Sequence, residues 1–481
     1  MNTAIVLNLT GVVLLFSSFF MLVPLLTSLF YRGTDLSAFG TSFLISFFFG
    51  LLLYFVTKSQ KKVELKHREG FAVVTISWLV MTFFGCLPYM LSDASLSFTN
   101  AYFEAMAGFT TTGASVMNDL ESLPHGILLW RSMTQWMGGM GIIVFSLAIL
   151  PMLGAGGMQL FKAEVPEIGV EKLKPRILDM AKSLWYIYAG LTMALIILLF
   201  IANMSFFDAV CHGLTTMATG GFSTKTASVA HFRDTYADVI ITVFMFLAGI
   251  NFSLHFYALR GNVSHYAKSS EFRFYCSTVL VAIAIITVNT MSEHSSLIET
   301  LRHASFQVVS IMTTTGFATA DYEIWPGLSQ MLLICLMFFG GMVGSTGGGM
   351  KQVRILLMFK QAYREMYHLI HPRAVSALKL DDRNIPKETL GGIWGFLFLF
   401  ILITVIASIL LAAMGVDMVT ATSTVISAMS NVGPALGDAG PTENYETIPV
   451  AGKWILILCM LAGRLEIYTV ILLFMPMFWE K

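Results

Sequence analysis

The sequence predicts an all-α polytopic membrane protein, built mainly from one helical unit that occurs four times. Of the 481 residues, 56% are hydrophobic and 12% are charged, which is about half the charged share of an average soluble domain. The mean hydropathy is +0.74, and apolar runs of about 20 residues, the length that crosses a bilayer, recur along the chain. A short Thr/Gly motif stands between several of these runs. The composition excludes a soluble globular protein, and the recurring motif indicates tandem repeats.

The first two predicted spans, residues 7–30 and 44–56, form an N-terminal two-helix hairpin. No secretory cleavage pattern follows the first span, so we interpret it as a retained helix and not as a signal peptide. We assign residues 1–69 to this hairpin and to the loop that follows it.

Basic residues gather in alternate loops, and this pattern predicts the topology. The basic loops are 58–68, 162–182, 260–273 and 351–387. Because the positive-inside rule places such loops in the cytoplasm, we expect a cytoplasmic N-terminus. Several loops between them lean acidic, for example at Asp321, Glu323 and Glu443, and are predicted to lie outside.

Four stretches that end on glycine mark the repeat. They read TTTG at 110–113, ATGG at 218–221, TTTG at 313–316 and SNVG at 430–433. The glycines lie about one hundred residues apart. Each motif follows a short apolar segment, and each short segment follows a full apolar span, at about 71–92, 183–203, 274–291 and 393–414.

An apolar helix follows each motif and carries a pair of small residues, such as Gly138-Gly139 or Ala462-Gly463. Such pairs alone are weak signals, since membrane helices often use small residues to pack closely. Four such pairs at a similar distance after each glycine motif are a strong signal of a repeat. The predicted unit is therefore a span (M1), a half-length pore helix, a Thr/Gly loop and a second span (M2). We place these units at residues 70–155, 156–260, 261–372 and 373–481.

The four loops suggest a cation filter. Backbone at membrane depth survives outside helices only in protein or along a water-filled path. Glycine permits dihedrals that turn consecutive carbonyls toward one axis, and rings of carbonyls can replace the hydration shell of K⁺. The sequence thus predicts one pseudo-fourfold pore. The candidate filter residues, which would bind K⁺ through backbone carbonyls, are Thr111, Thr112, Gly113, Thr219, Gly220, Gly221, Thr314, Thr315, Gly316, Asn431, Val432 and Gly433.

A glycine-rich segment interrupts the second span of the third unit, where six glycines fall within residues 340–349. Each one weakens a helix by about 1 kcal/mol relative to alanine, so we expect a break and interpret the segment as a gating loop. A phosphate loop is disfavoured because Met350 interrupts the motif and no Ser or Thr follows Lys351. A substrate site in a broken helix stays open as an alternative. The candidate gate residues are Gly344, Ser345, Thr346, Gly347, Gly348, Gly349 and Arg464.

Arg464 and Glu466 are charged residues inside an apolar span, and such residues are expected to face protein or water. Being two residues apart, they point to different helix faces and should not pair with each other. We expect Arg464 near the ion path, and Glu104 and Asp208 to be structural. Four of the five single cysteines lie in apolar segments and are expected to be small buried residues.

The filter motifs, the segment GGMVGSTGGGMK at 340–351 and AGRLE at 462–466 resemble the Trk/Ktr/HKT superfamily of potassium transporters, and within it the bacterial TrkH/TrkG branch. The resemblance covers nearly the whole chain, and the N-terminal hairpin matches the Trk type. It implies a protein of the bacterial cytoplasmic (inner) membrane, K⁺ as the transported ion and no organic cofactor. It further implies a homodimer in the lipid bilayer and a cytoplasmic, TrkA-like nucleotide-binding regulatory subunit.

Two functions from different classes remain open at this stage. One is a K⁺-conducting subunit with a gated carbonyl filter, and the other is a secondary K⁺ symporter coupled to H⁺ or Na⁺. An enzyme is not expected, because no nucleophile or metal-ligand spacing recurs in the apolar segments.

Overall fold

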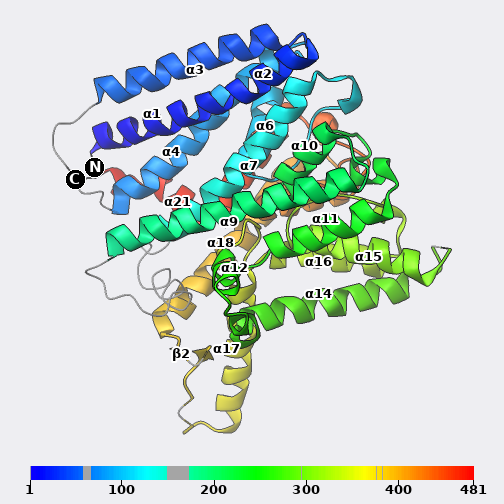
Figure 1. Ribbon diagram of the computed structural model, residues 1–481. Coiled ribbons are helices and arrows are strands. Elements are labelled where there is room, and N and C mark those ends of the chain that lie inside the picture. Colours follow the sequence, from blue (N-terminus) through cyan, green and yellow to red (C-terminus); the bar gives the residue numbers. More distant parts are fainter. Residues whose placement is uncertain are drawn as a thin grey trace.

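The computed structural model describes residues 2–57, 67–148, 173–293, 295–374, 376–381 and 383–480. The protein is a bundle of helices, most of which run along one common direction (Figure 1). Within the described part, six helices are long and apolar enough to cross a membrane, or up to eight if two bent pairs each count as one span. The predicted all-α, multi-span fold is confirmed.

Three helices form the N-terminal hairpin: α1 (Thr3–Phe20), α2 (Leu22–Tyr31) and α3 (Leu36–Val56). α1 and α2 together make one 29-residue apolar stretch. Gly11 and Gly50 let the two arms approach, since a Cβ on either would come within 3.0 Å of the facing helix. The buried carboxylate of Asp35 accepts the N–H of Ile127 at 3.0 Å, which ties the hairpin to the start of the helix at 125–148.

In the remaining chain, a long helix, a shorter helix, an irregular segment and another apolar helix come in this order in four successive stretches. The first two series are α4 (His67–Gly85), α5 (Leu87–Leu91), α6 (Phe98–Phe109) and α7 (His125–Ala148), then α9 (Leu173–Ile201), α10 (Phe206–Met217), α11 (Thr235–Ala248) and α12 (Phe252–Leu259). The next two are α14 (Ser270–Asn289), α15 (Leu297–Met312), α16 (Gly327–Phe339) and α17 (Gln352–Ile370), then α18 (Lys387–Ala413), α19 (Met418–Ser430), α20 (Val450–Arg464) and α21 (Ile467–Ile471).

Short elements complete the described chain. They are α13 (Ser264–Lys268), α22 (Pro476–Trp479), 3-10 turns at Leu120–Ser122, Ser228–Phe232, Tyr322–Ile324, Tyr445–Thr447 and Leu472–Phe474, and strands β1 (Lys379–Leu380) and β2 (Arg383–Asn384). The strands pair antiparallel with Lys379 opposite Asn384. This ribbon is a small exception to the predicted all-α fold.

The four short helices α6, α10, α15 and α19 form the buried centre, and local sequence explains where each begins. Ser97, Ser205, Ser296 and Asp417 are their N-cap residues, and each side chain accepts a backbone N–H of the first turn. Such caps each contribute about 1 kcal/mol. The C-terminal ends of the helices, which carry partial negative charge, lead into the four Thr/Gly motifs.

The second span is broken in three of the four series, whereas the sequence predicted a break only in the third. α11 and α12 meet at a bend of 99°, and α20 and α21 at 119°. Both breaks follow the small-residue pair. The carbonyls of Ala248 and Gly249 accept the N–H groups of Thr346 and Met342 from the glycine-rich segment. Carbonyls at the end of α11 are therefore satisfied by this segment.

Both chain ends lie on the same side of the bundle (Figure 1). The N–H of Asn2 donates to Glu69 at 3.0 Å, and Arg68 donates to the carbonyl of Glu480 at 2.7 Å. The predicted basic loops at 58–68 and 162–182 fall largely outside the described residues, as does the unit boundary at residue 155.

The expectation of buried cysteines holds only in part. Cys86, Cys211 and Cys459 are buried, whereas Cys276 is half-buried and Cys335, on α16, is exposed. A helix that faces lipid can leave apolar residues uncovered by protein, so an apolar segment does not by itself predict burial.

Candidate functional site

The four Thr/Gly motifs share one unusual backbone. The glycine that ends each motif has a positive φ: 79° at Gly113, 80° at Gly221, 80° at Gly316 and 106° at Gly433. Two positions earlier, Thr111, Thr219, Thr314 and Asn431 also have positive φ, between 51° and 60°. The glycines were expected on this ground. The left-handed Thr and Asn residues were not, because such conformers in a non-glycine residue are unfavourable by about 1–3 kcal/mol and need surrounding structure to hold them.

Hydrogen bonds back to the short helices supply that support. The N–H groups of Thr112 and Thr315 donate to the carbonyls of Ala107 and Ser310, both at 2.8 Å. The N–H groups of Gly220 and Val432 make the matching bonds, to Thr215 at 2.9 Å and Ser427 at 3.0 Å. These loop N–H groups therefore bond to carbonyls of the preceding short helix. The carbonyls of the loop residues take no part in these bonds.

The four loops contact one another in a closed circle. A Cβ on Gly113 would come within 3.0 Å of the carbonyl oxygen of Gly220, and a Cβ on Gly221 would meet that of Thr315 in the same way. A Cβ on Gly316 would likewise meet the carbonyl oxygen of Val432, and one on Gly433 would meet that of Thr112. Each loop thus abuts the next in chain order, and the last abuts the first. Only glycine fits at these contacts.

A cavity of about 90 Å³ opens beside this circle, and all four glycines line it together with Arg131, Lys225, Glu443 and Tyr445. Nearby, on a segment outside the spans, Glu323 accepts the N–H of Gly437. Burial raises the pKa of Glu323 above its ordinary value. The acidic loops named from the sequence, around Glu323 and Glu443, are thus on the cavity side of the circle.

A buried ion pair braces the first two loops. Arg131 on α7 donates from Nε to Glu104 on α6 at 2.8 Å, and both side chains are at most 2% exposed. Arg131 also donates to the carbonyl of Ser223 at 2.9 Å and to the hydroxyl of Ser115 at 3.1 Å. Glu104 additionally accepts the N–H of Val116 at 2.9 Å. Asp208 accepts hydroxyl donors from Ser205 and Thr224, so both acids make the kind of contact expected of structural residues.

The glycine-rich segment lies directly against the short helices and their loops. The hydroxyl of Thr346 donates to the carbonyl of Met217 at 3.1 Å, which is the last residue of α10. The N–H of Gly348 donates to the Thr314 hydroxyl at 2.6 Å. The N–H of Gly349 donates to the carbonyl of Ser430 at 2.9 Å. The segment therefore bonds just before the second Thr/Gly motif and within the third and fourth.

Arg464 joins this segment to α7. It is 3% exposed and donates to the carbonyl of Thr346 at 2.7 Å and to that of Gly138 at 3.2 Å. Glu466, which was not expected to pair with Arg464, pairs instead with Arg354. Arg354 also stands over the ring of Phe396, 4.2 Å from its centroid.

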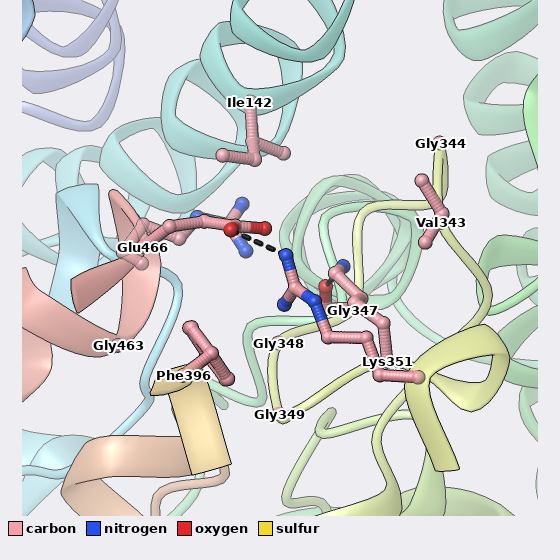
Figure 2. Close-up of a pocket in the computed structure, with 12 residues that line it drawn as sticks. Ile142, Val343, Gly344, Gly347, Gly348, Gly349, Lys351, Phe396, Gly463 and Glu466 are labelled. Carbon is pink, nitrogen blue, oxygen red and sulfur yellow. Dashed lines mark hydrogen bonds and ion pairs between the residues drawn. The ribbon is translucent and has the colours of Figure 1, made fainter. Parts of the chain in front are cut away.

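A small cavity of about 20 Å³ lies beside these groups, and Figure 2 shows Ile142, Val343, Lys351, Phe396 and Glu466 around it. Its walls come from α7, α18, the glycine-rich segment and the break between α20 and α21. Lys351 donates to the carbonyl of Gly347. Three cationic side chains and one carboxylate thus meet at the cavity.

Sequence reasoning missed two residues that hold these loops. The carboxylate of Glu271 accepts the N–H groups of Val343 at 2.9 Å and Val353 at 3.2 Å, and so joins the glycine-rich segment to the start of α17. Gln135 contacts the second Thr/Gly loop. Neither stands out in the sequence, because Glu271 lies in a polar first turn with Ser270 and Arg273, and Gln135 follows Arg131 and Thr134.

Comparison with known proteins assigns the family. A family model described as TrkH, a cation transport protein, matches residues 36–481. The chain belongs to this family. It is 41% identical over 486 residues to the Trk system potassium uptake protein TrkH of Escherichia coli (strain K12), with 100% of both chains covered. The protein of the same name from Halomonas elongata is 43% identical, again with full coverage of both.

A solved structure agrees with the fold. The crystal structure of the potassium transporter TrkH from Vibrio parahaemolyticus superposes with a TM-score of 0.92, at 38% identity and with 100% of both chains covered. This TrkH-family member is therefore a multi-pass membrane transporter and not an enzyme. No cluster of three or more His, Cys, Asp or Glu side chains that could hold a metal occurs among the residues that the structure describes.

We predict that Arg131→Met destabilises the folded protein by roughly 3–5 kcal/mol, because it leaves Glu104 buried and uncompensated. Thermal unfolding of the purified protein in detergent measures the effect. Arg364→Met is the matched control, since its 3.4 Å pair with the 60%-exposed Glu365 should contribute no more than about 1 kcal/mol. The double variant with Glu104→Gln should recover part of the loss. Equal effects of the two single variants would contradict a compensating ion pair.

Proposed function

We propose that this chain is the ion-conducting subunit of a K⁺ uptake system, with one pseudo-fourfold pore whose filter is the circle of four Thr/Gly loops. The closed circle of contacts carries the proposal. Among described residues, no hydrogen bond reaches the carbonyls of Thr112, Thr315 or Val432, and such free oxygens at membrane depth need a water-filled path or an ion. The names of the relatives, potassium uptake proteins, favour K⁺ as the cargo.

The polarity of the short helices supports this assignment. The four helices end at the circle, so their partial negative C-termini point toward it. The carbonyls of the loops add further negative potential. A cation in the circle would therefore be stabilised without a carboxylate. We propose the filter set named from the sequence, Thr111 to Gly113, Thr219 to Gly221, Thr314 to Gly316 and Asn431 to Gly433.

We propose that residues 344–349 and Arg464 form the gate below the filter. Charged hydrogen bonds such as that from Arg464 to Thr346 contribute about 1.5–3 kcal/mol each. Ordering of each loop residue opposes them by about 1–2 kcal/mol. A closed state held by so small a difference suits a switch, and the buried guanidinium itself opposes cation passage.

The symporter remains the second candidate, since bends of 99° and 119° in two spans are also found in alternating-access transporters. Reversal potentials of purified protein in liposomes, under separate K⁺, Na⁺ and pH gradients, distinguish the two. A conducting pore gives a potential set by K⁺ alone. Coupled transport shifts it with the gradient of the second ion.

We further propose an inner-membrane location with the N-terminus in the cytoplasm, a homodimer, and docking of a nucleotide-binding regulatory subunit on the basic cytoplasmic segments. The topology follows from the positive-inside pattern and from the shared side of both chain ends. The dimer and the TrkA-like partner follow from family likeness alone.

We predict that Gly113→Ser lowers the K⁺/Na⁺ permeability ratio about tenfold, equivalent to ~1.4 kcal/mol. Any side chain there would displace the Gly220 carbonyl and strain a backbone with φ of 79°. Reversal potentials in bi-ionic conditions measure the ratio. Gly190→Ser is the control, because nothing lies within 4 Å of its added Cβ. An unchanged ratio in folded Gly113→Ser protein would remove Gly113 from the filter.

We predict that Arg464→Ala, or a shortened 344–349 loop, increases K⁺ flux several-fold and leaves the K⁺/Na⁺ ratio nearly unchanged, because the gate loosens while the filter keeps its contacts. Tracer uptake into proteoliposomes measures the flux. Arg464→Lys, which keeps the charge but not the planar fork of donors, should give a K⁺ flux between those of wild type and Arg464→Ala. Loss of flux in both folded variants would instead favour a transport site in this loop.

We predict that the detergent-solubilised chain, taken from its native host, copurifies with a soluble nucleotide-binding protein. Substituting the exposed Arg373 and Lys379, which follow α17, should reduce that recovery. Mass spectrometry of the captured material tests this, and capture without any such subunit contradicts the partner assignment.

A further inference from the structure

The second Thr/Gly loop differs from the other three because a side-chain amide donates to the carbonyl of the residue just before its last glycine. Gln135 lies on α7 and is fully buried. Its Nε2 donates to the carbonyl of Gly220 at 2.6 Å, and its Oε1 accepts the N–H of Phe222 at 3.0 Å. The side chain therefore spans the loop glycine, Gly221, and fixes the backbone on both sides of it.

The carbonyl that Gln135 contacts is one of four equivalent groups. Each of these oxygens stands against the glycine of a neighbouring loop: Gly220 against Gly113, as Thr315, Val432 and Thr112 do against theirs. The other three accept no hydrogen bond from any described residue. One oxygen in four is thus already bonded, by a group outside its own unit.

This contact explains why the second motif reads Thr-Gly-Gly. A Cβ at Gly220 would come within 3.0 Å of three atoms of Gln135, so a larger residue is excluded while the glutamine is present. In the first and third loops the same place is taken by Thr112 and Thr315. Their hydroxyls bond within the loop, to Thr110 and Thr313 respectively, both at 2.8 Å. Gln135 replaces this internal support.

We propose that Gln135 is a positioning residue that sets the cation selectivity of the second loop, an inference that rests on the filter assignment made above. A donor 2.6 Å from the Gly220 oxygen offsets part of the negative potential that the oxygen presents to an ion. Selectivity depends on the number and field strength of the coordinating carbonyls, and a weaker field favours the larger K⁺ over Na⁺. The ring is then three free carbonyls and one that is hydrogen-bonded.

The test uses full-length purified protein in liposomes, with permeability ratios taken from reversal potentials. Gln135→Met keeps the volume but removes both hydrogen bonds. It should lower the K⁺/Na⁺ ratio roughly 3- to 10-fold, the factor that corresponds to one net hydrogen bond. Gln307→Met is the matched control: Gln307 is also fully buried and donates to a backbone carbonyl, that of Ala320 at 3.1 Å, outside the filter. The control should keep the ratio.

A second variant covers the case in which Gln135→Met fails to fold. Gly220→Thr alone should not give folded protein, because its Cβ meets Gln135, whereas Gly220→Thr with Gln135→Ala makes room and should fold with an altered ratio. A ratio within about twofold of wild type in either folded variant overturns the proposal. Wild-type protein that conducts K⁺ no better than Na⁺ would instead refute the filter assignment itself.

Discussion

The structure depends on one constraint: polar backbone inside a membrane must be satisfied by protein or face a water-filled path. In all four Thr/Gly loops the N–H groups turn back to the carbonyls of the preceding short helix, as Thr112 does to Ala107 and Val432 to Ser427. These bonds satisfy N–H groups of the loops and leave the carbonyls of Thr112, Thr315 and Val432 without a backbone partner among the described residues. The left-handed residues and the glycines are the geometric consequence, and the close loop-to-loop contacts exclude side chains at the glycines.

Buried charges are arranged differently on the two sides of the circle of loops. On the side of the larger cavity, Arg131 is matched by Glu104, so the pair adds no net charge. On the side of the glycine-rich segment, Arg464 is met by the carbonyls of Thr346 and Gly138, while Glu466 is matched by Arg354. One guanidinium there therefore keeps its charge. Under the proposed assignment of the circle as a filter, a cation that leaves it would meet this charge as long as residues 344–349 stay in place.

The helix α7 has a special place in this arrangement. It is the one second span that runs unbroken through its small-residue pair, from His125 to Ala148. It carries Arg131 and Gln135, which hold the first and second loops, and the carbonyl of Gly138, which accepts Arg464. A continuous helix can present these groups at fixed heights along one face. The other three helices end at or near their small-residue pair, α11 at Ala248, α16 at Phe339 and α20 at Arg464.

The sequence by itself determined the membrane class, the order of long and short helices, the four glycine positions and the break at residues 340–349. These follow from local physics: apolar length, N-cap residues such as Ser97 and Asp417, and the dihedral freedom of glycine. Tertiary structure alone decided the bends after Ala248 and Arg464 and the hydrogen bond from Gln135 to a loop 85 residues away. It also decided the two hydrogen bonds that Glu271 accepts from residues 72 and 82 positions away. It also decided that Glu466 pairs with Arg354 and that Cys335 faces outward. These features depend on how the helices and loops pack, and that packing, unlike the formation of a helix, is set by contacts between residues that are far apart in the chain.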